Sequence, residues 1–458
     1  FIDLHNHADR NILDNPGVEN FLFQGVTTIL AGNCGNSPVD FPEYMESVAR
    51  TGISLNMALL IGHNAVRAAV MGNDNRAPTR AEQAQMEGLV KAAMDAGAFG
   101  MSTGLIYLPG AYSATDEVIS LARVAAGSGG IYASHIRNEF GGIIAAIEET
   151  IRVGREAEVP VHISHFKVAD NTMWGASTRT LGLVEAARAA GQDVTIDQYP
   201  YTAGSTGLAN VMPKWARAGT REDVQARLDD PEVRARIKAE VIEILNGARA
   251  AGDLRRITVA SFPSRPEYVG RSLAEVTEMN GLKPTIENGA EVAMTILYDG
   301  HGEAIYHMMV EEDVRRIMTA PFTSIASDGS AVPFARNVPH LRNYGTFPRV
   351  LRKYVREEGV LTLEEAIHKM TALPASRMGL KTRGTLATGM TADISVFDAE
   401  TITDRDDWAN PHQYAHGVAY VLVNGVPVIA GGERTAAFPG AVLKRQVEQA
   451  ATAGGGHD

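Results

Sequence analysis

The sequence predicts an α/β fold in which eight short β-rich segments alternate with longer helical ones. The segments that read as strands are residues 1–5, 27–32, 55–61, 98–102, 130–135, 159–165, 194–199 and 323–326. Helix-periodic stretches separate most of them, for example residues 80–96, 116–126, 143–156 and 181–190. A strand followed by a helix, repeated along the chain, gives parallel strands joined by right-handed crossovers. Eight such units close into a (β/α)8 TIM-type barrel.

The alternation is interrupted once, between the seventh and the eighth predicted strands. Residues 203–320 are far more than one barrel unit requires, and their centre, residues 221–249, is charged and helix-periodic. We therefore expect an inserted subdomain there. Insertions at the carboxyl ends of barrel strands commonly shape the entrance to a site, so a lid is one interpretation, and an appendage that only adds stability is the other.

The last part of the chain has a different pattern. Residues 379–440 contain alternating β runs punctuated by turns, and they predict a small C-terminal β-sandwich. Because the sequence starts inside a predicted strand, we expect this sandwich to be partly missing at the N-terminus. The predicted organisation is barrel strands one to seven in residues 1–202, the inserted subdomain in 203–320, strand eight and its helix in 321–378, the sandwich in 379–440, and a tail in 441–458 that frays at residues 454–456.

The composition excludes several classes of protein. The 458 residues include 42 Lys plus Arg and 54 Asp plus Glu, a formal net charge of −12, so nucleic acid is not an expected partner. No apolar run approaches the roughly 18 residues that predict a membrane span. A single cysteine cannot form an intrachain disulfide, which fits a reducing compartment, and a cytoplasmic location is expected. The sequence does not predict the oligomeric state.

Candidate metal ligands occur at the ends of the predicted strands. His5 and His7 in FIDLHNH are two residues apart near the end of a strand, so both side chains lie on one face. The other candidates follow or end the second, fifth, sixth and eighth strands, and they are Cys34, His135, His165 and Asp328. These strand ends meet at the face where barrel active sites form. Imidazole, thiolate and carboxylate groups converging there predict a zinc site.

Two further histidines have other interpretations. His162 lies three positions before His165, so its side chain is expected on the opposite face of the strand, with a structural role. His63 ends the third predicted strand at the same rim as the ligands, where it is expected to orient other groups or the substrate by hydrogen bonds.

A set of motifs, taken together, resembles those of the D-aminoacylase or N-acyl-D-amino-acid deacylase family within the amidohydrolase superfamily. The motifs are DLHNH, GNCG, GAFGMSTGL, ASHIRNE, ISHFK, DQYPYTAGST, SDG and RNYGTFPRVL. The resemblance covers nearly the whole chain. It implies a zinc-bearing (β/α)8 barrel with a β-sandwich. It also implies hydrolysis of the amide of N-acyl-D-amino acids, small-molecule substrates, to a carboxylate and a free D-amino acid.

The resemblance implies a role for each candidate residue. Cys34, His135 and His165 match a tight zinc site, and His5, His7 and Asp328 match a second, weaker site, with the thiolate able to bridge. The residues that match contacts to the substrate are Lys167, Tyr199, Ser205 and Arg342. The family pattern has His-Pro-Arg where this chain has His340-Leu341-Arg342, so Arg336 and Arg349 remain alternatives to Arg342.

These residues predict a mechanism of amide hydrolysis. Zinc lowers the pKa of a bound water from about 15.7 toward roughly 7 and polarises the acyl carbonyl. Asp328 is expected to accept the proton of the water and to pass it to the leaving amine. Tyr199 or His63 is expected to donate a hydrogen bond to the developing oxyanion, and an arginine to hold the α-carboxylate of the substrate.

Two other functions remain open. A cyclic-amide hydrolase of the hydantoinase or dihydroorotase type would share the His-x-His pair, two later histidines and a final Asp. Those enzymes resemble one another in using a carboxylated Lys on the fourth strand as a bridge. In this chain the fourth predicted strand reads AFGMSTG and contains no Lys. A non-catalytic scaffold with the same fold predicts loss of ligands, whereas all six candidates are present. The sequence gives neither the preferred D-side chain nor the number of working metals.

Overall fold

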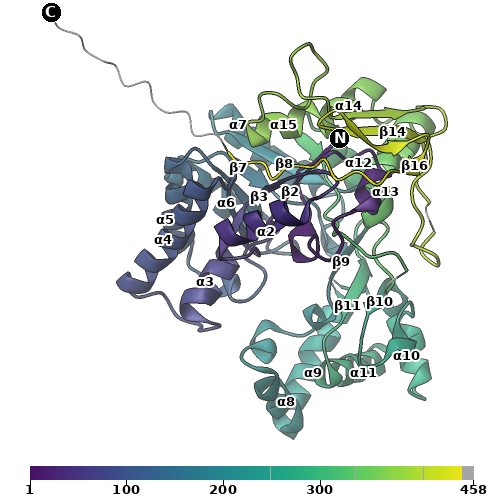
Figure 1. Cartoon of the computed structure of the whole chain (residues 1–458). Coiled ribbons are helices and arrows are strands. Elements are labelled where there is room, and N and C mark those ends of the chain that lie inside the picture. The colour runs from purple at the N-terminus through teal and green to yellow at the C-terminus, as the bar shows by residue number, and fades with distance from the viewer. Residues whose placement is uncertain (248, 336, 406, 446–458) are drawn as a thin grey trace, which may run out of the picture.

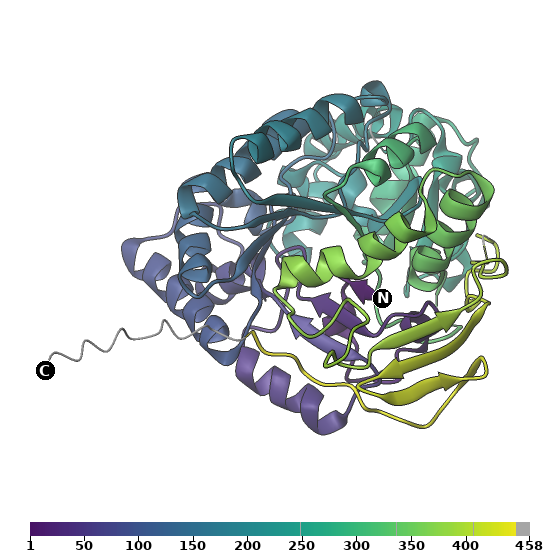
Figure 2. The same cartoon turned by 90° about the horizontal axis from the view of Figure 1, so that it is seen from above.

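A computed structural model describes residues 1–247, 249–335, 337–405 and 407–445. Its parallel strands form two sheets, with the orders β1-β2-β3 and β12-β8-β7-β6-β5-β4 (Figures 1 and 2). The strands are β1 (Ile2–Asp3), β2 (Thr28–Ala31), β3 (Asn56–Leu59), β4 (Ile61–Gly62), β5 (Gly100–Gly104), β6 (Ile131–His135), β7 (Val161–Ile163), β8 (Val194–Gln198) and β12 (Thr323–Ile325). All eight segments predicted as strands contain strands of these sheets.

The two sheets approach each other at both pairs of edges. β3 and β4 are separated only by Leu60, whose N–H donates a hydrogen bond to the carbonyl of Ala31 at 2.9 Å. The first and last strands are joined just beyond their ends. There, the N–H of Asp328 donates to the carbonyl of His5 at 2.8 Å, and the N–H of His7 donates to the carbonyl of Gly329 at 2.6 Å. Residues next to the predicted metal ligands therefore form the seam between the first and last strands.

Helices lie outside the parallel strands (Figure 2). They are α1 (Glu19–Leu22), α2 (Phe41–Thr51), α3 (His63–Met71), α4 (Arg80–Ala96), α5 (Thr115–Gly127), α6 (Ile143–Ala157), α7 (Ser177–Ala189) and α12 (Glu311–Thr319). The start of α4 is fixed by a capping box, in which the hydroxyl of Thr79 accepts from the N–H of Glu82 and the Glu82 carboxylate accepts from the N–H of Thr79. This capping satisfies backbone donors that the first turn leaves unpaired.

The segment between β8 and α12 forms its own antiparallel sheet, with the order β10-β11-β9. Its strands are β9 (Ala203–Gly207), β10 (Ile257–Ser261) and β11 (Glu303–His307), and its helices are α8 (Arg221–Asp229), α9 (Pro231–Asn246), α10 (Leu273–Met279) and α11 (Ile286–Asp299). These helices pack around a separate apolar core and lie beyond β9–β11, away from the C-terminal sheet (Figure 1). α12, by contrast, packs on α7 and β12, so it belongs to the parallel sheets rather than to the insertion.

The chain after β12 forms helices and then a separate sheet. The helices are α13 (Arg342–Arg349), which continues as a π-helix over Val350–Glu357, α14 (Leu363–Met370) and α15 (Ala372–Met378). The strands are β13 (Ile394–Phe397), β14 (Val418–Val423), β15 (Val426–Ala430) and β16 (Glu433–Arg434), all antiparallel neighbours in that order. The described residues thus contain one sheet in this region, whereas a sandwich needs two. Alternating runs specify strands, but they do not specify a second sheet to cover them.

The first residues of the predicted tail pair with distant segments. The N–H of Met57 donates to the carbonyl of Ala441 at 2.9 Å, and the N–H of Leu443 donates to the carbonyl of Met57 at 2.7 Å. The N–H of Arg445 donates to the carbonyl of Gly97 at 2.9 Å. Backbone pairing with distant segments therefore orders residues 441–445, which no local pattern indicates. Residues 454–456 lie outside the described residues.

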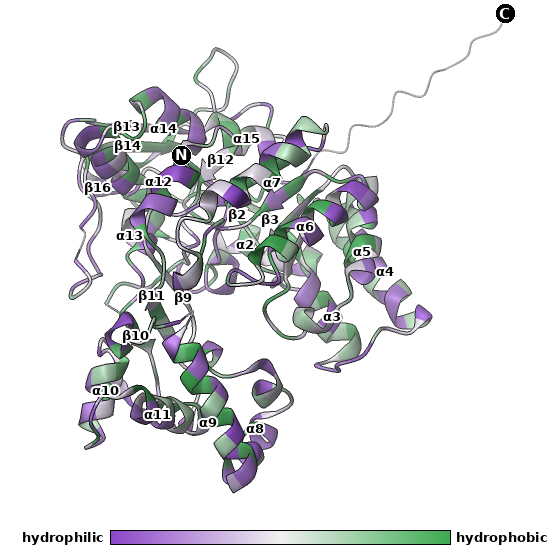
Figure 3. Ribbon diagram, turned by 180° about the vertical axis from the view of Figure 1, so that it is seen from behind, coloured by the Kyte–Doolittle hydropathy of each residue, from purple (hydrophilic) through white to green (hydrophobic). Residues whose placement is uncertain are grey.

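Short 3-10 helices connect several elements. They are η1 (Ala8–Arg10), η2 (Gly110–Tyr112), η3 (Asn171–Met173), η4 (Leu208–Val211), η5 (Lys214–Arg217), η6 (Leu254–Arg256) and η7 (Pro266–Tyr268). The outer helices α4 and α5 carry both hydrophobic and hydrophilic residues, as expected of helices with one buried face (Figure 3). Among the described residues, no helix has both the length and the apolar character needed to cross a bilayer.

The buried face of α5 provides a test of the core. Leu121 is fully buried between this helix and its neighbours, so Leu121→Ala removes apolar contacts and leaves a cavity. We expect the free energy of unfolding to fall by about 2–5 kcal/mol, measured by denaturant titration. The matched control is Leu386→Ala, because Leu386 is 82% exposed, and this change should stay within about 0.5 kcal/mol of the unsubstituted protein. Equal losses for the two variants would contradict the assignment of the core.

Candidate metal centre

The structure brings the six predicted ligands together at the carboxyl ends of the parallel strands. Their ligand atoms fall into overlapping groups whose members lie within 4.8 Å of one another. One group contains His5, Cys34 and His165, a second contains His5, His7 and Asp328, and a third contains His135, His165 and Glu139. All of these residues are buried.

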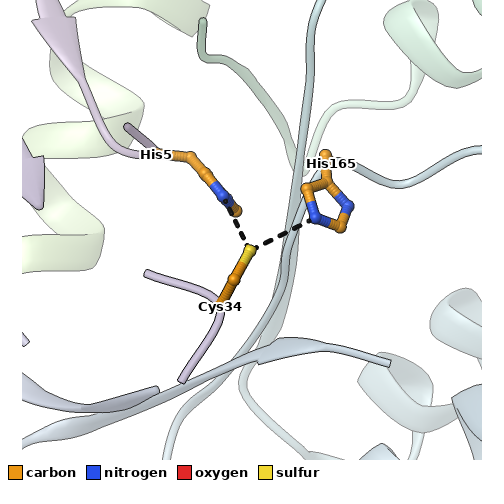
Figure 4. A group of neighbouring side chains, drawn as sticks. All are labelled: His5, Cys34 and His165. Carbon is orange, nitrogen blue, oxygen red and sulfur yellow. Dashed lines mark hydrogen bonds between the residues drawn. The ribbon is translucent and has the colours of Figure 1, made fainter. Parts of the chain in front are cut away.

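Cys34 lies at the centre of the first group. Its sulfur is 3.4 Å from Nε2 of His5, 3.6 Å from Nδ1 of His135 and 3.5 Å from Nε2 of His165 (Figure 4 shows His5, Cys34 and His165). A tetrahedral zinc ion with Zn–S near 2.3 Å and Zn–N near 2.0–2.1 Å separates sulfur from nitrogen by about 3.5 Å. The observed separations therefore suit a shared zinc ion.

Unsatisfied polarity also fits a bound metal. Nδ1 of His135 faces the Cys34 sulfur, whereas its Nε2 atom is buried without a hydrogen-bond partner among the described residues and lies 3.7 Å from a carboxylate oxygen of Glu139. Burial lowers the pKa of His135, so its imidazole is neutral, which is the form that binds metals. A thiolate with imidazoles is a donor set that zinc prefers over magnesium or calcium.

The second group is centred on Asp328. Its Oδ1 atom is 3.0 Å from Nε2 of His7 and 3.6 Å from Nε2 of His5, and its Oδ2 atom is 2.7 Å from Nη1 of Arg342. Burial alone would favour the protonated acid, but Arg342 and the histidines outweigh it and hold the pKa of Asp328 well below its usual range. The carboxylate is therefore ionised at neutral pH.

Opposite charges stabilise the thiolate of Cys34. Burial disfavours the charged sulfur, but His5 and His165 outweigh this effect and hold the pKa of Cys34 well below its usual range. Burial likewise opposes the charged form of His5, whose pKa is nevertheless raised well above its usual range by the Asp197 carboxylate and the Cys34 sulfur. The site is thus arranged around a negative sulfur.

Three ligand residues have a left-handed backbone. The φ angles are 54° for Cys34, 35° for His165 and 51° for Asp328. Side-chain-bearing residues rarely adopt this conformation, and its cost of about 1–3 kcal/mol per residue is met by the surrounding structure. The turns that end β2, β7 and β12 are therefore strained at the points where they present ligand atoms.

Asp197, at the end of β8, supports two ligands, and sequence reasoning missed it. Its Oδ2 atom is 3.2 Å from Nδ1 of His5 and 2.7 Å from Nε2 of His162, and its Oδ1 atom accepts the N–H of His165 at 2.7 Å. His162 is therefore structural, as predicted, but it acts through the same carboxylate that orients His5. The one available signal is that Asp197 occupies a strand end within DQYPY.

Glu139 is the second carboxylate that sequence reasoning missed. Its Oε1 atom is 3.0 Å from Nδ1 of His165 and accepts from Nζ of Lys167 at 2.5 Å. Nζ of Lys167 is also 2.8 Å from Nδ1 of His165. Lys167, predicted to contact substrate, thus holds Glu139 and His165 in place. The position of Glu139, four residues after His135 in ASHIRNE, is the only sequence signal for it.

The other predicted substrate contacts fall into two places. Arg342 lies over the ring of Tyr199 at 4.9 Å, and its Nη2 atom donates to the carbonyl of Ser205 at 3.4 Å, so Tyr199 and Ser205 adjoin the arginine that pairs with Asp328. His63 is elsewhere, because its Nε2 atom is 2.9 Å from the carboxylate of Glu117. Within the described part of the chain, no hydrogen bond or ring contact joins His63 to a predicted ligand.

Arg349, one of the two alternatives to Arg342, contacts other residues. Nη1 of Arg349 is 3.2 Å from the carboxylate of Asp404, and its Nε atom donates to the carbonyl of Pro200 at 2.8 Å. Arg336 lies outside the described residues. Among the arginines considered, Arg342 is the one seen beside Asp328.

A parallel α/β sheet with a buried thiolate, imidazoles and carboxylates at its carboxyl edge defines the class of metal-dependent hydrolases. The chain belongs to the amidohydrolase family, whose model matches residues 1–429. It is 38% identical to a D-aminoacylase of Alcaligenes xylosoxydans xylosoxydans over 97% of this chain and 86% of that protein. It is 37% identical to an N-acyl-D-aspartate deacylase of the same organism, over 97% of this chain and 84% of that protein.

Solved structures of this family have the same fold. A D-aminoacylase structure, 36% identical, matches 97% of this chain and 88% of that chain with a TM-score of 0.82. An N-acyl-D-glutamate deacylase from Bordetella bronchiseptica, solved with zinc and a phosphonate mimic of the tetrahedral intermediate, is 34% identical over 97% of this chain and 88% of that chain, with a TM-score of 0.81. A dihydropyrimidinase from Brevibacillus agri, 13% identical with a TM-score of 0.55, shares the fold alone.

The shared sulfur yields a direct test. Cys34→Ala removes the atom that three imidazoles face, so we expect zinc and hydrolytic activity to be lost together. The loss of zinc affinity should exceed the roughly 10–100-fold that a supporting hydrogen bond is worth. The measurement is elemental analysis of the purified protein beside an activity assay. The control, His301→Ala, changes an exposed histidine and should keep both; a metal-replete, fully active Cys34→Ala protein would refute the assignment.

Asp197 supplies a test of the supporting carboxylates. Asp197→Ala leaves His5 and His162 without their shared acceptor, so His5 is no longer oriented. We expect zinc affinity to fall about 10–100-fold, measured by competition with a chromogenic chelator, while the fold is kept. Asp299→Ala, at the end of α11, is the matched control. Unchanged affinity in Asp197→Ala would show that the carboxylate does not orient the ligand.

Proposed function

We propose that this chain hydrolyses N-acyl-D-amino acids to a carboxylate and a free D-amino acid with zinc as cofactor, at the mouth of a closed (β/α)8 barrel made by the two parallel sheets. The observation that carries the proposal is the Cys34 sulfur within 3.4–3.6 Å of three imidazole nitrogens, beside the carboxylate of Asp328. The similarity to D-aminoacylase and to two acidic N-acyl-D-amino-acid deacylases over 97% of the chain supports the substrate class.

We assign one tight and one weaker metal position. The tight position is formed by Cys34, His135 and His165, and the weaker one by His5, His7 and Asp328. The 3.4 Å separation of the Cys34 sulfur from Nε2 of His5 supports a thiolate that is shared between the two. Zinc bound there supplies Lewis acidity and makes water nucleophilic near neutral pH.

Asp328 is assigned the proton transfers. Its carboxylate is ionised, so it accepts a proton from the attacking water and later gives it to the leaving amine nitrogen. Arg342 is assigned the α-carboxylate of the substrate, because its guanidinium already lies 2.7 Å from a carboxylate oxygen of Asp328 and can form a bidentate pair.

Tyr199 is assigned the hydrogen bond to the developing oxyanion. Burial raises its pKa well above the usual range, despite the opposing charge of Arg342, so the phenol keeps its proton and can donate. His63 is not retained in this role, since its Nε2 atom faces Glu117. Lys167 is a positioning residue for Glu139 and His165, and Ser205 contributes its backbone carbonyl to holding Arg342.

We also propose the organisation and setting of the chain. The inserted subdomain is residues 203–310, ten fewer than the sequence predicts, because α12 packs with the parallel sheets. The place of β9 beside Tyr199 and Arg342 favours a role at the entrance over one in stability alone. A reducing compartment such as the cytoplasm suits the single reduced, buried cysteine.

The alternatives receive less support. Cyclic-amide hydrolases of one type use a bridging lysine on the fourth strand. That lysine has no counterpart in β5, which reads GMSTG. A non-catalytic scaffold gives no reason for an ionised carboxylate and a strained thiolate at one site. The discriminating assay is turnover of N-acetyl-D-methionine, its L-enantiomer and a hydantoin by protein of measured zinc content. Turnover confined to the hydantoin, or none by zinc-replete protein on a panel of N-acyl-D-amino acids, would overturn the proposal.

Asp328 provides the test of the mechanism. Asp328→Asn keeps an oxygen ligand but removes the basic carboxylate, so kcat should fall at least about 10²-fold while zinc at the Cys34 position is retained. Steady-state kinetics with elemental analysis measures both. Asp313→Asn, a buried carboxylate on α12 that hydrogen-bonds Ser177, is the matched control and should keep kcat near its normal value. Near-normal turnover in Asp328→Asn would exclude the proton-transfer role.

A further inference from the structure

The inserted segment brings two partly or wholly buried arginines and a lysine to one side of the metal-ligand cluster. Lys214 and Arg217 are the first and last residues of η5, and Arg249 follows α9. Arg249 is only 7% exposed. Buried guanidinium groups are normally paired with carboxylates, because an unpaired charge away from water loses its hydration without compensation.

Neither arginine has such a partner. Nη1 of Arg217 donates to Oδ1 of Asn210 at 3.0 Å, and its Nε atom is buried without a hydrogen-bond partner. Arg249 stacks on the rings of Phe140 and Tyr306 at 4.6 and 5.0 Å. Among the described residues, the one hydrogen-bond contact of its side chain is with the sulfur of Met308 at 3.8 Å. Throughout the described ranges, no Asp or Glu oxygen lies within 4.0 Å, the limit for an ion pair, of the side-chain nitrogens of Lys214, Arg217 or Arg249.

Contacts also link the two arginines. Nδ2 of Asn210, which accepts from Arg217 through Oδ1, and the hydroxyl of Tyr306, whose ring lies beneath Arg249, donate to the same carbonyl of Gly207 at 3.0 and 3.2 Å. The pKa of Arg217 is lowered, first by burial and then by the positive charge of Arg249. Groups of like charge that are held together in this way gain most from an anion between or beside them. Glu303, at the start of β11, is exposed, and among the described residues no ion pair joins its carboxylate to Arg217 or Arg249.

A chain of contacts links Arg217 to the metal centre. The ring of Tyr107 lies 4.7 Å from the ring of His135, and its hydroxyl is 3.3 Å from the hydroxyl of Thr206. Nδ2 of Asn210 donates to the same Thr206 hydroxyl at 3.1 Å, and Oδ1 of Asn210 accepts from Arg217. Three side chains therefore separate a predicted metal ligand from an arginine without a counter-ion.

Arg249 adjoins the same centre from another side. The Phe140 ring beneath it directly follows Glu139, the carboxylate that contacts His165. The Met308 sulfur at its Nη1 atom belongs to the residue after β11, the strand that pairs with β9. Arg217 and Arg249 thus reach the surroundings of the metal ligands through β9, β11 and the loop after β6.

We propose that Arg217 and Arg249, with Lys214 at the exposed rim, form a subsite for a carboxylate on the side chain of the substrate, so that the preferred substrates are N-acyl derivatives of acidic D-amino acids. This inference rests on the proposed function. A dicarboxylate would then have a cation for each end, with Arg342 beside Asp328 for the α-carboxylate and the two arginines for the side chain. The planar guanidinium fork suits bidentate carboxylate binding.

The names of the relatives do not decide this point, because an aminoacylase at 38% identity stands beside D-aspartate and D-glutamate deacylases at 37% and 36%. The decisive comparison is between substrates of the same shape that differ in charge. We expect kcat/KM for N-acetyl-D-glutamate or N-acetyl-D-aspartate to exceed that for the matching N-acetyl-D-glutamine or N-acetyl-D-asparagine at least about 10²-fold. N-acetyl-D-methionine serves as the apolar reference.

Two variants locate the subsite. Arg217→Met and Arg249→Met keep much of the apolar stem, so packing on Phe140 and Tyr306 is largely preserved. We expect KM for the acidic substrate to rise at least about 30-fold, whereas kcat/KM for N-acetyl-D-methionine stays within about threefold. The control, Arg221→Met, removes a guanidinium of the same subdomain that faces only the carbonyls of Tyr298 and Asp299, and it should change neither. Zinc content and the thermal midpoint are measured for every variant.

The outcomes separate the two levels of the argument. Three outcomes would each overturn the subsite and leave the proposed function standing. The first is equal kcat/KM within both matched pairs, N-acetyl-D-glutamate with N-acetyl-D-glutamine and N-acetyl-D-aspartate with N-acetyl-D-asparagine. The others are a preference for N-acetyl-D-methionine, and arginine variants that affect acidic and apolar substrates equally. Turnover of no N-acyl-D-amino acid would instead overturn the proposed function. If an arginine variant does not fold, calorimetric titration measures the affinity of the inactive Asp328→Asn protein for the same two matched pairs of substrates. Equal affinities within both pairs would again overturn the subsite.

Discussion

A single sulfur atom at the end of the second strand is the point around which the site is organised. Three imidazoles from the first, fifth and sixth parallel strands face it at 3.4–3.6 Å. A buried thiolate is stable only with positive charge beside it, supplied by cationic imidazoles or by a metal ion. The surrounding chain is therefore constrained to deliver these groups to one place, and it does so from turns with left-handed backbone at Cys34, His165 and Asp328.

Carboxylates from neighbouring strands fix the imidazoles in turn. Asp197 at the end of β8 contacts His5 and His162 and accepts the backbone N–H of His165, while Glu139 and Lys167 hold the far side of the His165 ring. His5 and His165 are thus oriented by residues from other strands or loops. Such support is available only where the carboxyl ends of several parallel strands converge, which explains why the site and the sheet topology cannot be separated.

The succession of parallel strands and the gathering of the six candidate ligands at one place were predictable from sequence, because both depend on local features: short β-rich runs, helical periodicity and residues at strand ends. Asp197 and Glu139 were missed because their importance comes from contacts between segments, and nothing in their immediate neighbours reveals it. The same reason explains residues 441–445, which are ordered by pairing with Met57 and Gly97. His63 sits at the predicted rim, yet Glu117 on α5 binds its Nε2 atom. The sandwich, predicted to be partly missing, is represented among the described residues by the separate sheet of β13 to β16.

The seam between the first and the last parallel strands coincides with the ligands. Asp328 and His5 are joined through their backbones, and His7 through that of Gly329, so residues of the candidate metal centre also close the gap between distant parts of the chain. Evolution therefore has little freedom to lengthen or shorten the loops at this junction, since any change in length would shift ligand atoms and backbone pairing together. The long segment after β8 takes no part in this seam, so its length can differ without moving the junction between the first and last strands.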